Sequence, residues 1–224
     1  MKNLTTEQIG TVSNYILSFD IKWYELQVEL TDHFVSIMEE IWNEDPALTF
    51  HQVKYRAEQR FGRNYFKEVE EKRIKELRNE HKRIQLKMVS EYLKLPKIVL
   101  SVLMVFVVYR MSFYFEDIAI YIKILFGILL GASLFTILNW YRYRKINGKR
   151  FLALETALRL NTKSVVFSYF SIVLVNSFKQ TVHENYLIYL PFYLFWGLGL
   201  LLILTGYKIT NKVAFRIKKQ YQLT

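Results

Sequence analysis

The sequence predicts an all-α membrane protein with a small helical cytosolic domain, a long linking helix and a four-helix transmembrane bundle. Charged residues are dense up to about Lys94, and long apolar runs dominate the rest of the 224-residue chain. Four of these runs approach or reach the roughly 20 apolar residues that a helix needs to cross a bilayer. The segments between the runs are alternately rich and poor in Lys and Arg, which indicates repeated crossing of the membrane.

Composition narrows the function classes before any motif is considered. The chain contains no cysteine, which excludes disulfides, thiolate nucleophiles and cysteine metal sites. The formal net charge is +11. Because most of the excess lies beside the predicted spans, we interpret it as setting topology and attracting anionic headgroups, rather than as a nucleic-acid surface. The segment Met1–Thr6 has no apolar core or cleavage site, so we expect the first span to direct the chain to the membrane.

The first domain, residues 1–63, reads as a set of short helices. Apolar residues at three-and-four spacing predict one helix from about Thr6 to Phe19 and a second from about Lys22 to Trp42. A capping-box pattern, Thr49 with Gln52, predicts the start of a third helix that closes at a glycine. The domain is therefore predicted to be a small helical bundle.

A long charged helix is predicted to link this domain to the membrane, over residues 64–95. Its apolar residues form a thin stripe, interrupted by His81, that is too short to identify a coiled coil. The helix is either a solvated stalk, which we favour, or a coiled coil with a second copy. The stripe consists of Ile74, Leu77, Ile84 and Met88.

The membrane domain is predicted to cover residues 96–207 and to be followed by a basic cytosolic tail, 208–224. Pro96 is suited to the first turn of a helix, where its missing N–H costs nothing. The third span is the shortest, because its apolar core runs only from Val165 to Phe178. The four predicted spans are residues 96–115, 118–141, 163–179 and 186–207.

The basic residues predict that the N-terminus and the C-terminus both lie in the cytoplasm of a bacterial cell, with the spans in its inner membrane. The segment between the second and third spans and the C-terminal tail are both rich in Lys and Arg. The other two loops are poor in them: one carries Glu116 and Asp117, and the other carries Lys179, His183 and Glu184. This alternation requires four crossings.

The spans themselves indicate anchoring and packing. Their middles carry no charge, and Arg110 and Lys123 lie near the outer ends, so a charge-coupled pump is not indicated. Gly127 and Gly131, with Ala132 and Ser133, form a small-residue face that permits close helix approach. We favour packing of this face within the chain's own bundle, with a homodimer contact as the alternative.

The second predicted helix carries the polar residues that are best placed to form a metal or acid–base site. Glu25, Glu29 and His33 share one face at a spacing of four, which is compatible with a metal ligand set or acid–base chemistry. We favour a structural role, with Asp32 or His33 hydrogen-bonding across the domain. No phosphate loop or nucleophile elbow is present, so we expect no enzyme, no catalytic residues, no metal and no cofactor.

One stretch, YILSFDIKWYELQVELTDHFVSIMEEIWNEDPALTFHQVKYRAEQRFG, resembles the HAAS-type helical domain of bacterial membrane proteins. The matching features are the segment from Glu29 through Asp32 and His33, the acidic pair Glu39 and Glu40, the proline turn and the Phe-Gly ending. Such proteins join short N-terminal helices to several spans, and many are encoded beside PadR-like regulators. The resemblance implies signalling or regulation, and it makes these five polar residues candidates for binding a partner or structuring the domain.

Together these observations favour a membrane-anchored regulatory or interaction protein. Its cytosolic domain would bind a cytosolic or membrane protein partner, in signalling or sequestration. The alternative is a non-catalytic subunit of a membrane transport or export complex.

Overall fold

The computed structural model describes residues 3–62, 64–179 and 189–222, and the side chains of these except 139–143 and 178–179. The predicted loop residues His183 and Glu184, and residues 186–188 of the predicted fourth span, lie outside the described residues. Within the described part, the regular secondary structure is helical apart from one isolated two-residue bridge.

The chain divides into two compact units. The N-terminal unit consists of residues 1–77 together with residues 145–152, and the membrane unit consists of residues 78–144 and 153–224. The prediction placed residues 145–152 in the membrane domain. They belong with the N-terminal unit because their apolar side chains are buried there, as described below.

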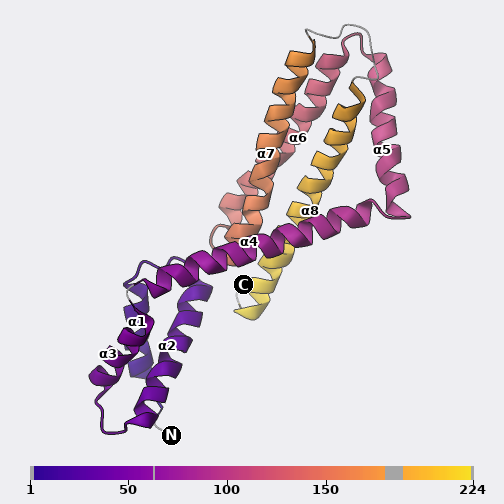
Figure 1. Cartoon of the computed structure of the whole chain (residues 1–224). Helices are drawn as coiled ribbons and strands as arrows, with labels where there is room; N and C mark the ends of the chain where they lie inside the picture. The colour runs from indigo at the N-terminus through magenta and orange to yellow at the C-terminus, as the bar shows by residue number, and fades with distance from the viewer. Residues whose placement is uncertain (1–2, 63, 180–188, 223–224) are drawn as a thin grey trace. The chain divides into compact units, whose positions relative to one another are not determined.

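Helices α1 (Thr6–Leu17), α2 (Tyr24–Glu44) and α3 (Phe50–Phe61) lie side by side in the N-terminal unit (Figure 1). The predicted capping box of α3 is confirmed: Thr49 accepts from the backbone N–H of Gln52, whose side chain accepts from the backbone N–H of Thr49. Gly62 ends this helix with a φ of +72°, a conformation that side-chain-bearing residues rarely adopt.

Aromatic rings fill the core of the N-terminal unit. Phe34 of α2 and Phe61 of α3 stack with centroids 5.1 Å apart and planes inclined by 16°. Phe66, at the start of α4 (Tyr65–Tyr92), stacks on Phe61 at 5.8 Å. Tyr15 of α1 contacts Phe34 at 5.5 Å. These contacts join all four helices, so the first turn of α4 is part of the domain core.

Residues 145–152 form a tight turn in the N-terminal unit. Ile146 and Lys149 exchange two backbone hydrogen bonds of 3.0 Å across Asn147 and Gly148, whose φ values are +49° and +77°. Positive φ at both central positions is the type I′ hairpin geometry that Asn-Gly favours. The apolar residues on either side, Ile146 and Phe151, are buried.

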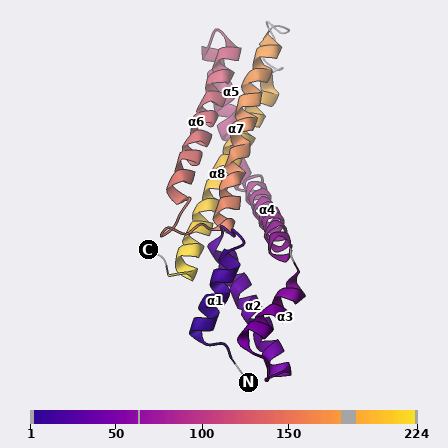
Figure 2. The ribbon, with the colours of Figure 1, turned by 90° about the vertical axis from the view of Figure 1, so that its left-hand side faces the viewer.

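Among the described residues, four helices are long and apolar enough to cross a membrane. The first is α5 (Lys97–Met111), which continues into a short 3₁₀ helix, η1 (Ser112–Tyr114). Helices α6 (Ile118–Tyr143), α7 (Leu152–Lys179) and α8 (Leu190–Gln220) run alongside one another in two perpendicular views (Figure 1, Figure 2). The multi-span prediction is confirmed at this level.

Two helices extend beyond their predicted spans. Helix α7 begins at Leu152, well before the predicted start at Lys163. Helix α8 continues without a break through Gln220, so most of the predicted basic tail is helical. Hydropathy marks only the apolar part of a helix, and the polar turns that continue it carry no such signal.

Glycines of α8 permit close contact with three neighbours. A Cβ on Gly197 would lie 2.9 Å from Val105 of α5. One on Gly199 would lie 3.1 Å from Leu129 of α6 and 3.2 Å from Phe167 of α7. Helix α8 is therefore the centre of the bundle, because close approach between membrane helices depends on small residues at the contact.

The second half of α4 packs on α7 and α8 within the membrane unit. His81, Gln85 and Val89, spaced by four, are buried, whereas Ile84 of the predicted stripe is exposed. Gln85 Nε2 donates to the carbonyl of Leu202 at 3.0 Å. The prediction of a solvated stalk is therefore wrong for this half of the helix. Of the predicted stripe, Leu77 is buried and Met88 packs against a core cluster, whereas Ile84 is replaced on the buried face by Gln85. A polar residue can belong to a buried face when it finds a hydrogen-bond partner there.

Candidate functional site

Two of the five candidate residues of α2 make contacts within the N-terminal unit. Glu39 Oε1 accepts from the backbone N–H of Leu4 at 3.0 Å, which fixes the start of the chain. Glu40 forms an ion pair of 3.1 Å with Arg60 of α3, and Arg60 also pairs with Glu44 at 3.6 Å. All three of these side chains are well exposed, so the pairs orient α3 against α2 and contribute little to stability.

His33 has a packing role. Its ring meets Phe61 edge-on with centroids 5.4 Å apart, and it lies 6.5 Å from Tyr65. The imidazole therefore covers one edge of the aromatic core. Among the described residues, no group of three or more His, Asp or Glu side chains is placed to hold a metal ion, and the row formed by Glu25, Glu29 and His33 is no exception.

Glu29 and Asp32 of α2 are the exposed acidic candidates that form no ion pair with the other described residues. They lie three residues apart, so they share one face of the helix. This exposed acidic pair is available for contact with another molecule.

The contact that sequence reasoning missed lies at the start of α2. The Lys149 ammonium lies 3.6 Å from the centroid of the Tyr24 ring, and the Arg150 guanidinium lies 4.9 Å from that of Trp23. The backbone N–H of Tyr24 donates to the carbonyl of Arg150 at 2.8 Å. Trp23 Nε1 donates to Glu70 Oε1 of α4 at 2.5 Å. We call these five residues the Trp23–Tyr24 junction.

The junction combines attractive forces of three kinds. The rings of Trp23 and Tyr24, at the start of α2, both face cations, an arrangement worth from about 0.5 to about 2 kcal/mol, more where the pair is desolvated. The Phe151 ring adds an edge-on contact with Tyr24, with centroids 5.8 Å apart. The sequence signal was present in the Asn-Gly dipeptide between Ile146 and Lys149, which is a strong hairpin pattern. Nothing in the sequence showed that this hairpin would pack on α2.

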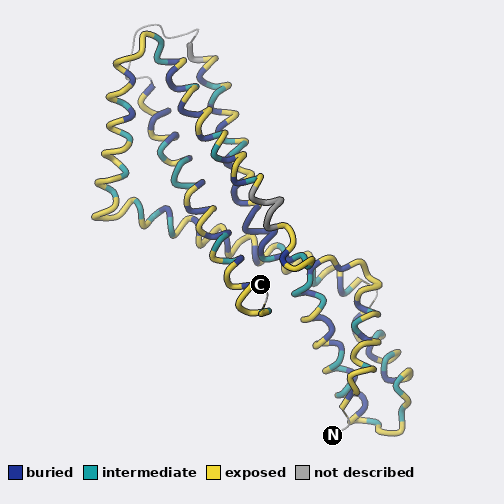
Figure 3. The backbone as a smooth tube through the Cα atoms, turned by 180° about the vertical axis from the view of Figure 1, so that it is seen from behind, coloured by how far each residue is buried: buried dark blue, intermediate teal, exposed yellow. Residues whose placement is uncertain are grey.

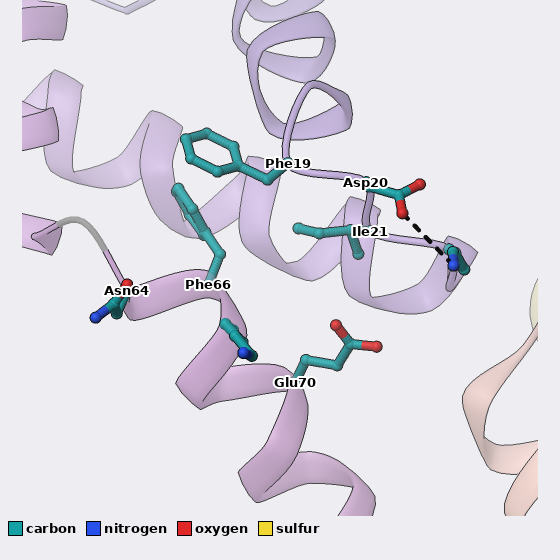
Figure 4. A pocket seen from close by; sticks show the side chains of 8 residues that line it. Phe19, Asp20, Ile21, Asn64, Phe66 and Glu70 are labelled. Atoms are coloured by element: carbon teal, nitrogen blue, oxygen red, sulfur yellow. Dashed lines mark ion pairs between the residues drawn. The ribbon is translucent and has the colours of Figure 1, made fainter.

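A shallow cavity of about 420 Å³ lies next to the junction (Figure 4). The loop between α1 and α2 forms one side and the start of α4 forms the other. Asp20 adopts a left-handed φ of +56° and pairs with Lys22 at 3.5 Å. The lining residues are Phe19, Asp20, Ile21, Lys22, Asn64, Phe66, Lys67 and Glu70. Its mixed charges indicate no particular ligand.

Among the residues that the structure describes, two groups outside the spans have shifted pKa values. Burial raises the pKa of Tyr15 to about 12, with further contributions from the charge of Glu58 and a hydrogen bond to it. Burial lowers the pKa of His81, and Arg216 adds to this effect while Glu80 opposes it. His81 Nδ1 lies 3.2 Å from Thr156 Oγ1 of α7. The neutral imidazole is therefore part of the packing between α4 and α7.

Helix α7 carries a buried polar stripe that the sequence reading overlooked. The spacing of three, four and three residues places its members on one helix face. Asn161 Oδ1 and Ser168 Oγ are buried without a hydrogen-bond partner in the described structure, whereas Ser171 donates to the carbonyl of Phe167 at 2.9 Å. Small polar residues of this kind usually join membrane helices to one another. The stripe consists of Asn161, Ser164, Ser168 and Ser171.

The two glycines of the small-residue face of α6 lie on the outside of the bundle, whereas Ser133 of the same set is buried. Gly127 and Gly131 are exposed, and a Cβ built on either one meets nothing within 4 Å. The favoured prediction, packing within the chain's own bundle, is therefore wrong for these two glycines. The close-contact role belongs to the glycines of α8 instead. The face of α6 is open to lipid or to a helix from another molecule.

Comparison with known proteins adds no assignment: no family model, no curated protein and no solved structure matches the chain. The likeness of residues 15–62 to HAAS-type domains stays a prediction.

Proposed function

We propose that this chain is a membrane-anchored regulatory protein whose N-terminal unit lies in the cytoplasm and binds a protein partner. Binding would be relayed to the spans, or would sequester the partner at the membrane. The proposal places both termini inside and the spans in the inner membrane of a bacterial cell. It includes no catalytic step.

The observation that carries this proposal is the Trp23–Tyr24 junction. The turn formed by residues 145–152 is continuous in the chain with α6 on one side and α7 on the other, and α4 runs on from the N-terminal unit to α5. The domain is thus tied to the spans by three lengths of chain instead of one. A domain that is only anchored to the membrane would need one connection to the spans. Three connections favour a domain whose binding state changes the conformation of the spans.

The exposed acidic pair on α2 supports a partner with a basic surface. Glu29 and Asp32 carry charge into solvent without contributing to the fold, whereas Glu39 and Glu40 are engaged in it. Exposed charges of this kind steer association and select partners, more strongly at low than at high ionic strength.

Site-specific photo-crosslinking in living cells tests the partner. A photoreactive amino acid at position 32 of the full-length protein should crosslink to another protein, and Glu29→Gln should reduce the yield. The matched control is a photoreactive residue at position 68 with Glu71→Gln, two exposed positions of α4 in the same unit. Equal crosslinking from positions 32 and 68, or none from position 32, would show that Glu29 and Asp32 do not form the partner-binding surface.

Absence of cysteine allows the relay to be tested in the same molecule. A single cysteine at Asn147 reports on the turn, and one at Gln59 of α3 serves as control, since both side chains are exposed. Partner binding should change the thiol labelling rate at position 147 and leave that at position 59 unchanged. An unchanged rate at position 147 would reduce the proposal to sequestration alone.

Orientation is tested by labelling with a membrane-impermeant maleimide. A cysteine at Glu116 should react in intact cells, whereas cysteines at Asn147 and Gln59 should react only after permeabilisation. Reaction at position 147 in intact cells would reverse the proposed topology.

The open face of α6 favours one second candidate, a non-catalytic subunit of a membrane transport or export complex. Gly127 and Gly131 leave room for a helix of another membrane protein. In this case Gly127→Ile with Gly131→Ile should release a co-purifying membrane protein in mild detergent. Loss of a second copy instead would identify a homodimer contact.

A further inference from the structure

A cluster of positive charge in the membrane unit lies where α5 begins and where the apolar part of α8 ends. Tyr92 ends α4, Lys97 begins α5, and Lys208 lies on α8 just past the apolar part of that helix. Lys208 Nζ donates to the Tyr92 hydroxyl at 2.6 Å. The ammonium groups of Lys97 and Lys208 each lie 5.3 Å from the centroid of the Tyr92 ring.

Among the residues that the structure describes, no carboxylate forms an ion pair with this cluster. Neither Lys97 nor Lys208 takes part in an ion pair within the described residues, and the adjacent Glu91 is exposed and takes part in none. Two like charges brought close to one ring repel each other, so an anion between them would relieve the repulsion. Because Tyr92 accepts from Lys208, its own O–H remains able to donate to such an anion.

The helix beside the cluster is covered by protein to an unusually small extent. Only 11% of the α5 span is buried, compared with 39% in each of the other three. No residue of α5 before Val108 is buried, and this helix is the outermost one on the left in Figure 3, yellow and teal over most of its length. The half of α5 nearer to α4 is therefore open to lipid.

Each lysine lies next to exposed apolar residues on its own helix face, on the side towards the middle of the span. Leu100 and Met104 lie three and seven residues after Lys97 and are 70% and 43% exposed. Leu204 lies four residues before Lys208 on α8 and is 43% exposed. Each helix thus presents a cation at the headgroup level and an exposed apolar surface towards the centre of the bilayer.

We infer that Lys97, Lys208 and the Tyr92 hydroxyl bind the phosphate of an anionic glycerophospholipid, whose acyl chains lie along the exposed apolar surfaces of α5 and α8. The two ammonium groups supply charge, and the hydroxyl supplies a directional hydrogen bond. The lipid would hold the junction between α4 and α5 against α8. This site is independent of any partner of the N-terminal unit.

Native mass spectrometry of the full-length protein in mild detergent tests the site. Phosphatidylglycerol should bind in preference to phosphatidylcholine of the same acyl composition. Each lysine near a charged lipid surface contributes about 1 kcal/mol, so Lys97→Gln with Lys208→Gln should weaken phosphatidylglycerol binding about thirtyfold. Tyr92→Phe keeps the ring and removes the hydroxyl, so it should have a smaller effect.

Matched control variants distinguish a specific lipid site from nonspecific electrostatic attraction between the lipid and the basic protein. Lys212→Gln with Lys218→Gln removes the same charge from exposed positions of α8 and should leave phosphatidylglycerol binding unchanged. Lys97→Arg with Lys208→Arg should retain it, which also guards against misfolding of the glutamine variant. Equal weakening in both glutamine pairs, or no weakening in either, would overturn the proposal. Displacement of the lipid by inorganic phosphate at equal concentration would overturn the acyl-chain part.

Discussion

The ammonium group of Lys149 lies 3.6 Å from the centroid of the Tyr24 ring. The two residues are 125 positions apart in the chain, because 149 minus 24 is 125, and the lysine lies in the segment that joins α6 to α7. A residue whose charge would normally be explained by membrane topology alone is therefore also part of the N-terminal unit. The proposed relay depends on this contact.

Replacing Gly148 with alanine should loosen the turn. Gly148 has a φ of +77°, where an L side chain costs about 1 kcal/mol, so the Ile146–Lys149 hairpin should open more often. Limited trypsin digestion should cut faster after Lys149 and Arg150. Gly10→Ala is the matched control: Gly10 lies inside α1 with open space around its Cβ, so alanine should stabilise that helix by about 0.5–1 kcal/mol. Unchanged cleavage in Gly148→Ala would show that the turn is not held as described.

Replacing Trp23 with phenylalanine should destabilise the N-terminal unit by about 1–3 kcal/mol. The ring contact with Arg150 is largely kept, but Glu70 loses its hydrogen-bond donor, and hydrogen bonds to charged groups lie in this range. Thermal unfolding of the full-length protein measures the effect. In a double-mutant cycle, Trp23→Phe should cost much less when Glu70 is already Ala. Additive effects of the two substitutions would contradict the hydrogen bond.

Acidification should weaken the packing of α4 on α7. The pKa of His81 is lowered, chiefly by burial, so the unfolded chain takes up a proton at higher pH than the folded chain. The stability that the neutral imidazole contributes is therefore complete above the unfolded pKa of about 6.5 and is lost as the pH falls below it. His81→Gln should reduce the loss of melting temperature between about pH 7.5 and about pH 5.5.

The control for this titration is His51, which is exposed on α3. His51→Gln should leave the pH dependence of the melting temperature as it is in the unaltered protein. If both variants show the same reduced dependence, or neither does, the buried position of His81 does not govern the acid response.

Alanine at Gly206 should destabilise the membrane unit, whereas alanine at Gly127 should not. A Cβ on Gly206 would overlap Asn161 Oδ1 of α7, which is itself buried, and overpacking of this kind costs about 1–3 kcal/mol. A Cβ on Gly127 meets nothing within 4 Å. Thermal unfolding in detergent compares the two. Asn161→Ala should recover part of the loss in Gly206→Ala, and failure to recover any would contradict this contact.

Short-range patterns in the sequence were informative for the helices. The capping box of Thr49 and Gln52 and the glycine after Phe61 marked the ends of α3, because caps act over three or four residues. Long apolar runs marked the membrane-crossing helices, because the bilayer sets a minimum length. Both signals are local, so no tertiary information is needed to read them.

The face that each helix buries could not be read in the same way. In α4, the buried face runs through His81 and Gln85 and not through Ile84, because the carbonyl of Leu202 and the hydroxyl of Thr156 supply hydrogen-bond partners. Periodicity assigns polar residues to the exposed face of a helix. A polar residue that is buried with a hydrogen-bond partner is therefore assigned to the wrong face.

Within the spans, polarity carries even less information about packing. Lipid and protein interior are equally apolar, so Gly127 and Gly199 are indistinguishable by hydropathy, although one faces outward and the other contacts two helices. The sequence by itself determined the helical class, the caps of α3 and the number of long apolar helices among the described residues. Only the tertiary structure decided which glycines pack, which face of α4 is buried and that the turn at Asn147 joins α2, since each depends on partners distant in the chain.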